Sequence, residues 1–178
     1  MIGRDFFRRS PLECSRDLIG AILRWGNFAG NVVETEAYDS EDDPACHTFF
    51  RPSTRKFVAM HDAGAAYVYL NYGMHWLFNV LVKSDEGSGF VLLRAVEPMF
   101  SELPNSIAAG PGKLTRFLGI DGSVHGSKFL ETPQRGITRS GLPEVVTGRR
   151  IGISKAKELP WRFGDPASPA LSRPFESA

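Results

Sequence analysis

The chain has 178 residues, 42% of them hydrophobic and 23% charged, which predicts one globular domain over residues 1–178 with a buried core. It contains no apolar run of about eighteen residues and no apolar stretch near its first residue, so neither a membrane span nor a secretory signal is expected. Two cysteines are too few for a disulfide framework. Four histidines show no zinc-ligand spacing, so we expect no metal site.

The formal net charge of +1 hides an uneven distribution. Residues 31–50 carry six acidic and no basic side chains, whereas residues 111–178 carry eleven basic and six acidic ones. Such asymmetry permits a polyanionic partner without requiring one, and a solvated surface accounts for it equally well.

The first third of the chain is expected to contain a helix, a strand and a long loop. Residues 11–23 show a rough helical period and end like a strand. Residues 32–38 alternate between apolar and polar side chains, as a strand does. Residues 39–56 are rich in Asp, Pro, Ser and Thr and read as a loop.

The middle of the chain predicts an antiparallel sheet. Residues 66–72 and 75–83 alternate on either side of a turn and form a hairpin, and residues 89–97 form the next strand. Consecutive strands joined by short turns favour an antiparallel arrangement. We therefore expect a mixed α+β fold, in which short helices surround a curved antiparallel sheet with a protruding hairpin.

The last third predicts a short helix followed by irregular structure. Residues 110–119 have Pro near the first helical turn and Gly just past the last. Residues 121–148 read as loops and short strands, and residues 150–153 as a short strand. From residue 163 the chain is rich in Pro, Ser and Ala and is expected to extend over the surface.

Tyr72 lies at the expected tip of the hairpin, within the turn sequence Asn71-Tyr72-Gly73-Met74. An aromatic ring at an exposed tip suits insertion into another molecule, for example between two base pairs of DNA. The alternative is a tyrosine that packs on a neighbouring loop.

Glu36 and Arg94 are charged residues in strands that otherwise favour burial. Glu36 shares one face of its strand with Glu34 and Tyr38. If the sheet brings Arg94 close, the ion pair favours the charged form of the carboxylate, which can then hold and deprotonate a water molecule. The alternative is a structural salt bridge at a sheet edge.

Three further polar or aromatic positions stand out, and each also has a plain structural explanation. Asn79 interrupts an apolar strand face and is either a pocket residue or a satisfied buried amide. His47 follows the acidic loop and is either a ligand contact or an ordinary loop histidine. Tyr69 shares a strand face with Tyr67, and the pair is either a stacking platform or part of the core.

The segment Gly110-Pro111-Gly112-Lys113 can present free backbone amides to a phosphate at a helix start. It is similar to the hairpin of helix-hairpin-helix DNA-binding proteins. It is not a Walker A loop, because Leu114 follows the lysine where Ser or Thr is required. A simple capped helix is the alternative.

Taken in order, these segments form a recognisable set. They are Val33-Glu34-Thr35-Glu36-Ala37-Tyr38, Asp42-Asp43-Pro44-Ala45-Cys46-His47, Tyr67-Val68-Tyr69-Leu70-Asn71-Tyr72-Gly73-Met74-His75, Asn79, Val91-Leu92-Leu93-Arg94-Ala95-Val96-Glu97-Pro98 and Gly110-Pro111-Gly112-Lys113-Leu114. Across nearly the whole chain the set resembles the alkyladenine DNA glycosylases, also called methylpurine or 3-methyladenine DNA glycosylases.

The resemblance implies a monofunctional enzyme of base excision repair that flips a damaged purine out of duplex DNA. Tyr72 matches the wedge that fills the gap left by the flipped nucleotide. Tyr38 matches the ring that stacks on one side of the base, and His47 and Tyr69 match those on the other. The substrates implied are 3-methyladenine, 7-methylguanine, hypoxanthine and ethenoadenine.

The resemblance also assigns the chemistry. Glu36 matches the general base, Arg94 the residue that helps hold the attacking water, and Asn79 the residue that excludes normal guanine. The family needs no metal or organic cofactor and leaves an abasic site. The implied partner is damaged double-stranded DNA, bound by a monomer in the cytoplasm of a bacterium, at the nucleoid, or in the nucleus of a eukaryote.

Residues placed to meet the DNA backbone complete the expected site. They are Arg51, Arg55, Lys56, Gly112 and Lys113. The chain departs from the family pattern at Gly164-Asp165-Pro166-Ala167, a segment from which a main-chain carbonyl normally helps hold the water. It departs again at Lys56, where many relatives have Asn.

Two other functions are open from the residues alone. A helix-hairpin-helix glycosylase or lyase would use an Asp after its hairpin, with a Lys nucleophile for lyase activity, but the many expected strands argue against it. A non-catalytic nucleic-acid-binding module would use the aromatic side chains for stacking only.

Overall fold

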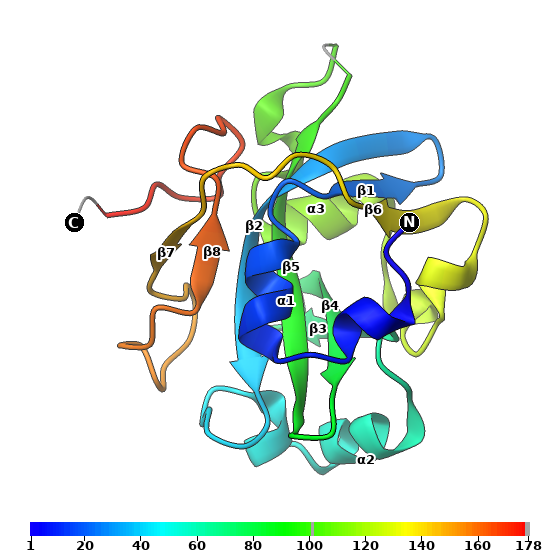
Figure 1. Ribbon diagram of the computed structural model, residues 1–178, viewed down its shortest axis with the longest axis vertical. Helices are drawn as coiled ribbons and strands as arrows, with labels where there is room; N and C mark the ends of the chain where they lie inside the picture. The colour runs from blue at the N-terminus through cyan, green and yellow to red at the C-terminus, as the bar shows by residue number, and fades with distance from the viewer. Residues whose placement is uncertain (101, 177–178) are drawn as a thin grey trace.

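The computed structural model describes residues 1–100 and 102–176, and it is built on one strongly curled antiparallel sheet (Figure 1). The strand order is β3-β4-β5-β2-β1-β6, and β7 and β8 continue the sheet beside β2. The strands are β1 Ile22–Trp25, β2 Phe28–Asp39, β3 Ala66–Asn71, β4 His75–Lys83, β5 Ser88–Pro98, β6 Arg135–Thr138, β7 Val146–Gly148 and β8 Arg162–Gly164. The helices are α1 Pro11–Asp17, α2 Pro52–Met60 and α3 Pro111–Leu118. The expected mixed α+β class is confirmed.

Strand β2 is the longest strand and changes partners along one edge. It pairs with β5 along its length, while its other edge pairs first with β1 and then, from Glu34 to Glu36, with β8. The register with β5 shifts on either side of Glu34, which marks a β-bulge. Bulges bend a strand and redirect its side chains. The bulge therefore lies where β2 carries its two buried glutamates.

The main core packs the curled sheet against α1, which covers one face of β2 and β5 (Figure 1), and it continues to Leu114 of α3 and to Phe129. It contains the fully buried Phe7, Phe78 and Phe129. A smaller cluster of Phe57, Tyr67 and other apolar residues lies between α2 and the hairpin. This second cluster supports the strands that carry the site.

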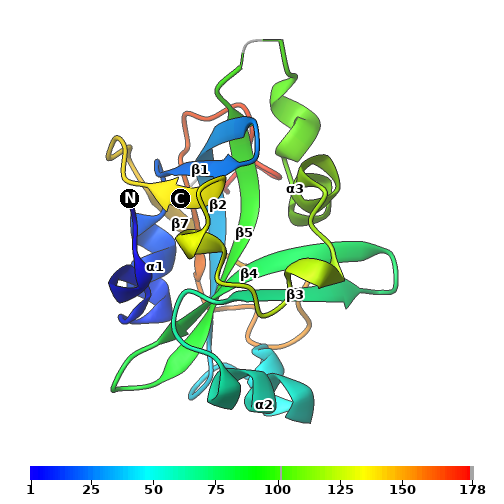
Figure 2. The same cartoon turned by 90° about the vertical axis from the view of Figure 1, so that its right-hand side faces the viewer.

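The hairpin of β3 and β4 projects from the body of the protein, with α3 above it and α2 below (Figure 2). The Met74 amide donates to the Asn71 carbonyl at 3.0 Å, and both residues between them have positive φ, 48° at Tyr72 and 69° at Gly73. Two positive φ angles suit the right-handed twist of a hairpin. The expected hairpin and its tip tyrosine are confirmed.

Two expectations about helices and strands are wrong, and so is the expectation for the C-terminal segment, described in the next paragraph. Helix α2 lies largely within the segment expected to be a loop. The sequence does not predict this helix because its nine residues bury only Thr54 and Phe57 and show no clear periodicity. Residues 150–153 are not a strand. The side chain of Arg150 is buried and the amide of Ile151 bonds a carboxylate instead of a neighbouring strand.

The C-terminal segment is not simply extended over the surface. It begins in β8 and then folds back, so that Ala170 is fully buried. Among the described residues, no helix is long and apolar enough to cross a membrane.

Candidate active site

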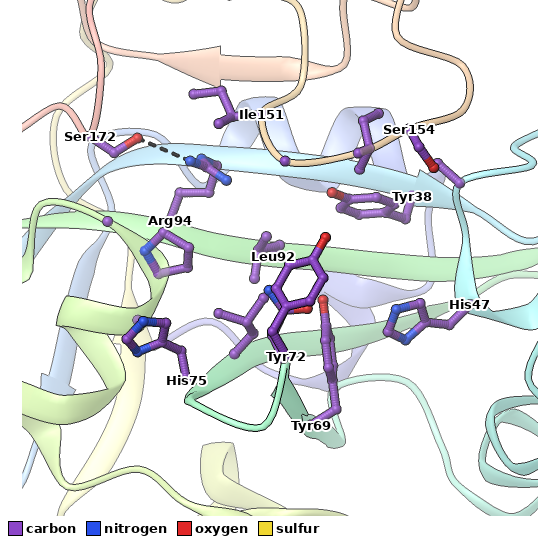
Figure 3. Close-up of a pocket in the computed structure, with 18 of the residues that line it drawn as sticks. Tyr38, His47, Tyr69, Tyr72, His75, Leu92, Arg94, Ile151, Ser154 and Ser172 are labelled. Atoms are coloured by element: carbon purple, nitrogen blue, oxygen red, sulfur yellow. Dashed lines mark hydrogen bonds between the residues drawn. The ribbon is translucent and has the colours of Figure 1, made fainter.

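A cleft of about 1160 Å³ opens beside the hairpin. Its walls come from six parts of the chain: the end of β2 with the loop after it, the hairpin, β5, the start of α3 with the residues before it, residues 151–157 and residues 172–173. Figure 3 shows the rings of Tyr38, His47 and Tyr69 around one end, and Arg94 with Ser172 at the other. Segments far apart in sequence thus form one site.

The described side chains that line the cleft include seven basic and no acidic ones. The basic residues are Arg51, Arg94, Lys113, Arg116, Lys155, Lys157 and Arg173. Three members of the acidic block at residues 31–50, namely Glu34, Glu36 and Asp43, are fully buried and paired with arginines. The cleft is therefore far more positive than the net charge of +1 indicates.

Tyr38, His47 and Tyr69 line the cleft and also a smaller cavity of about 20 Å³ that Asn79 borders; this aromatic region is called the slot below. The His47 and Tyr69 ring centroids are 4.4 Å apart. Asn79 is buried, and its Nδ2 donates to the Tyr67 carbonyl at 3.2 Å. The four residues expected to form a base pocket thus lie together.

His47 is held as a neutral ring. Its Nδ1 lies 2.9 Å from the Tyr67 hydroxyl, which also contacts Thr54 Oγ1 at 2.8 Å. Burial, with a smaller contribution from the positive charge of Arg51, lowers the pKa of His47 to about 4. At neutral pH the slot therefore contains no imidazolium charge.

Glu36 has no exposed surface and lies behind the cleft wall, in contact with Tyr38, Arg94 and Ile151, which line the cleft. Its Oε2 accepts a hydrogen bond from the Tyr38 hydroxyl at 2.7 Å, and its Oε1 accepts one from the Ile151 amide at 2.7 Å. Arg94 Nη1 lies 3.2 Å from Oε1. Burial, together with the adjacent Glu36 charge, raises the pKa of Tyr38, so the hydroxyl stays a proton donor.

Arg94 joins both buried glutamates. Its Nε donates to Glu34 Oε1 at 2.8 Å, and its Nη2 donates to Ser172 Oγ at 3.1 Å (Figure 3). Ser172 in turn donates its amide and hydroxyl to Glu34 at 2.6 and 2.7 Å. Burial alone would lower the pKa of Arg94, but the carboxylates of Glu36 and Glu34 outweigh burial and raise it. The guanidinium is thus fixed in place and charged.

Tyr72 stands at the cleft mouth with 81% of its surface exposed. It is a non-glycine residue with positive φ, a conformation that is uncommon outside constrained or functional turns. The protein therefore displays this ring on a tight turn at the hairpin tip.

The fold and this geometry can be compared with known proteins. A family model described as methylpurine-DNA glycosylase (MPG) matches residues 5–169. The chain belongs to the methylpurine-DNA glycosylase family.

Many similar proteins are bacterial and are named as candidate 3-methyladenine DNA glycosylases. One from Rhodopseudomonas palustris is 40% identical, covering 98% of this chain and 89% of its own length. One from Nitrosospira multiformis is 41% identical, covering 95% and 92%.

Only some of the residues expected to meet DNA phosphates lie in the cleft. Arg51, Gly112 and Lys113 line it, whereas Arg55 and Lys56 lie outside it on α2. Arg55 Nη1 donates to the Thr48 carbonyl at 2.6 Å and so braces the loop.

Gly112 has a steric role beside the hairpin. A Cβ there would lie 3.0 Å from the His75 ring, so a larger residue would require that ring to shift by a few tenths of an ångström. This packing brings Lys113 to the cleft wall.

The sequence does not identify several residues that the structure places in the site. Ile151 and Ser172 supply hydrogen bonds to the buried glutamates, and Lys155 and Lys157 add charge to the cleft. The backbone amide that donates to Glu36 comes from Ile151, a position that the motifs did not single out. Only the excess of basic residues near the C-terminus hinted at the lysines.

Within residues 1–100 and 102–176, no three His, Cys, Asp or Glu side chains are grouped so that they could hold a metal ion.

Proposed function

We propose that the protein is a monofunctional DNA glycosylase that flips alkylated or deaminated purines from duplex DNA and hydrolyses the N-glycosidic bond, leaving an abasic site. The observation that carries the proposal is the position of Glu36. A buried carboxylate, bonded to Arg94, Tyr38 and the Ile151 amide, lies directly behind the wall of a strongly basic cleft and next to its aromatic rings.

The cleft suits the phosphate backbone of DNA. Basic side chains bind DNA mainly by neutralising phosphates and releasing counterions. Lys113, Arg116, Lys155, Lys157 and Arg173 are exposed, and they flank the slot from more than one side. Family membership and this charge support damaged double-stranded DNA as the partner, bound by a monomer.

The aromatic residues suit a flipped base. Tyr72 would enter the stack as the nucleotide leaves it, which replaces part of the lost stacking. The base would then lie between Tyr38 and the pair of His47 and Tyr69. Stacking of a base on an aromatic side chain is worth about 1–3 kcal/mol. Asn79, fixed by its bond to the Tyr67 carbonyl, would exclude the 2-amino group of normal guanine.

Glu36 would act as the general base. A carboxylate has about four acceptor positions, and the three contacts at Glu36 leave room for a water molecule. The water must arrive from the cleft, past Tyr38, Arg94 or Ile151, because Glu36 has no exposed surface.

In the reaction the water oxygen bonds to the anomeric carbon while the bond to the base breaks and its electron pair leaves with the base. The water proton passes to Glu36, and Arg94 keeps the water and carboxylate aligned. General-base help is typically worth about 10²–10⁴-fold in rate. An alkylated base is already a good leaving group, so the slot mainly selects the substrate.

The proposal is tested by a base-release assay on duplexes that contain 3-methyladenine, 7-methylguanine, hypoxanthine or ethenoadenine. Release of at least one of these bases, with an intact sugar-phosphate backbone, is the expected result. Binding without release of any would instead support a non-catalytic module. A lesion-dependent covalent adduct trapped by borohydride would show a lyase and overturn the monofunctional assignment. Because the relatives are bacterial, the proposed setting is the bacterial chromosome.

A further inference from the structure

Arg150 is a buried arginine next to the site, yet it does not line the cleft. Its side chain and that of Asp43 have no exposed surface. The two planar groups meet as a fork: Nη2 donates to Oδ1 at 2.8 Å and Nη1 donates to Oδ2. Nη1 also donates to the Ala37 carbonyl at 2.9 Å. The guanidinium is thus anchored to β2 and to the loop that follows it.

The Arg150 guanidinium also lies against the ring of Tyr38. Its Cζ is 4.7 Å from the Tyr38 ring centroid and 5.2 Å from that of Trp161. The other end of Tyr38 is held by its hydroxyl, which donates to Glu36. Arg150 therefore fixes the plane of the ring, while Glu36 fixes its tip.

The partner of Arg150 controls the opposite wall of the slot. Asp43 accepts the Ala45 amide at 3.0 Å through its side chain and the Cys46 amide at 2.8 Å through its carbonyl. His47 follows directly. One ion pair thus links the Tyr38 wall to the loop that presents His47.

The same segment reaches the catalytic carboxylate. Ile151 follows Arg150 in the chain, and its amide donates to Glu36 Oε1 at 2.7 Å. Once Arg150 is locked in its fork, its neighbour has little freedom to leave Glu36. Both walls of the slot and the orientation of Glu36 therefore depend on Arg150.

Stability alone does not account for this arrangement. Burying an ion pair costs desolvation, and well-packed apolar residues often stabilise a protein equally well or better. Lysine cannot replace the fork, because it lacks the planar group that bonds both carboxylate oxygens and stacks on a ring. The need for that geometry points to alignment of the site.

We propose that Arg150 is a positioning residue, which sets the width of the base slot and the orientation of Glu36 through Tyr38, Asp43 and the Ile151 amide. The inference rests on the proposed glycosylase function. It goes further by assigning alignment to a residue that touches neither the DNA nor the attacking water.

The experiment compares Arg150→Lys and Asp43→Asn with the wild type on an ethenoadenine duplex. Misplacing reacting groups by about 1 Å can cost about 10²-fold in rate. We expect single-turnover release, corrected for the folded fraction, to fall about 10²-fold in each variant. The fluorescence change as the base enters the slot should shrink, while affinity for undamaged duplex stays near the wild-type value. Because both changes break one fork, the double variant should be little worse than either single one.

Arg9→Lys is the matched control. Arg9 also bonds a carboxylate, Asp17 at 2.7 Å, and a carbonyl, that of Phe6 at 3.1 Å, and it lies 4.4 Å over the Phe6 ring, away from the cleft. Because Arg9 and Asp17 are part-exposed, this variant controls for the loss of a planar arginine contact away from the cleft, and the correction for the folded fraction accounts for the stability effect of burial. Its release rate and fluorescence change should match those of the wild type.

The outcomes separate the two proposals. If the wild type releases none of the four lesion bases, the proposed function fails, whatever Arg150 does; if it releases a base other than ethenoadenine, the same rate comparison is made on that lesion. If the wild type is active and folded Arg150→Lys releases the base at the wild-type rate with the full fluorescence change, the positioning role is overturned. A rate loss that disappears after correction for the folded fraction also overturns it, because Arg150 would then serve stability only.

Discussion

Buried carboxylates distinguish this protein at the scale of single residues. Glu34, Glu36 and Asp43 belong to the acidic stretch of the sequence, but each is enclosed and paired with Arg94 or Arg150. A buried charge is tolerated only when it is paired and hydrogen-bonded. Of the three, Glu36 is the one whose contacts Tyr38, Arg94 and Ile151 all line the cleft.

Replacing Glu36 by Gln should abolish base release and leave DNA binding nearly intact. The amide keeps the size of the side chain but cannot take the water proton, so the rate should fall by at least about 10²-fold. The measurement is single-turnover release at saturating enzyme, with affinity for the lesion duplex measured separately.

Glu97→Gln is the matching control, because Glu97 on β5 accepts a hydrogen bond from Ser168 and does not line the cleft. Its release rate should equal that of the wild type. Release by Glu36→Gln within a few-fold of wild type would remove Glu36 from the role of general base.

The neutral state of His47 predicts how stability depends on pH. Burial lowers its pKa in the folded protein to about 4, below the ordinary value of 6.5. Between these values the unfolded chain binds a proton that the folded protein does not. The free energy of unfolding therefore receives the full contribution of His47 above pH 6.5 and loses it progressively as the pH falls toward 4.

The measurement is the urea midpoint of wild type and His47→Gln at pH 7 and pH 4.5. The wild type should lose more stability than the variant over this interval, since Gln has no proton to take up. Equal losses would show that His47 is accessible to protonation in the folded protein.

At the scale of elements, patterns local in sequence gave reliable predictions and tertiary contacts did not. The hairpin, the strand at residues 88–98 and helix α3 follow from alternation, turn residues and a Pro start with a Gly end. Helix α2 was missed because it is short and buries few residues. The alternation of apolar residues with glycine predicts a strand at residues 150–153. Such a pattern cannot show that the side chain of Arg150 pairs with Asp43.

The candidate site shows the same division. Tyr38, His47, Tyr69 and Asn79 were recognised because the motifs around them match a family, and the fold brings them together. Ser172 gave no local signal, since its role depends on a C-terminal segment that folds back onto Glu34. The function of such a residue is visible only once the fold is known.

The hairpin tip should act as a separable element. Tyr72→Ala removes the exposed ring from a tight turn, and alanine has the same steric difficulty with positive φ as tyrosine, so the melting temperature should barely change. Release from paired lesions should slow, because no side chain replaces the flipped base in the stack. Unpaired lesions should be affected less, since little stacking is lost there.

Release rates on paired and unpaired lesions test this prediction. Leu142→Ala, at an equally exposed apolar residue outside the cleft, is the control and should leave both rates unchanged. A Tyr72→Ala variant slowed by the same factor on both substrates would not support a wedge.

At the scale of the whole molecule, the fold separates charge that the sequence mixes. Three of the six acidic residues at positions 31–50, namely Glu34, Glu36 and Asp43, are buried against arginines, while basic residues from α3, residues 151–157 and the C-terminal segment line the cleft. A protein of net charge +1 thereby presents one strongly positive surface. Such a surface attracts a polyanion without making the rest of the molecule bind it.

This separation predicts how binding depends on salt. Each phosphate neutralised contributes about −0.9 to the slope of log K against log salt concentration. Lys155→Ala and Lys157→Ala, both at exposed cleft residues, should each weaken binding to any duplex and make the slope shallower by about 1. Arg24→Ala, at an exposed basic residue on β1 outside the cleft, changes the net charge equally and should leave the slope unchanged. The measurement is the affinity for an undamaged duplex over a series of salt concentrations. If all three substitutions changed the slope alike, net charge and not the cleft would govern binding, and the DNA would have to lie elsewhere on the protein.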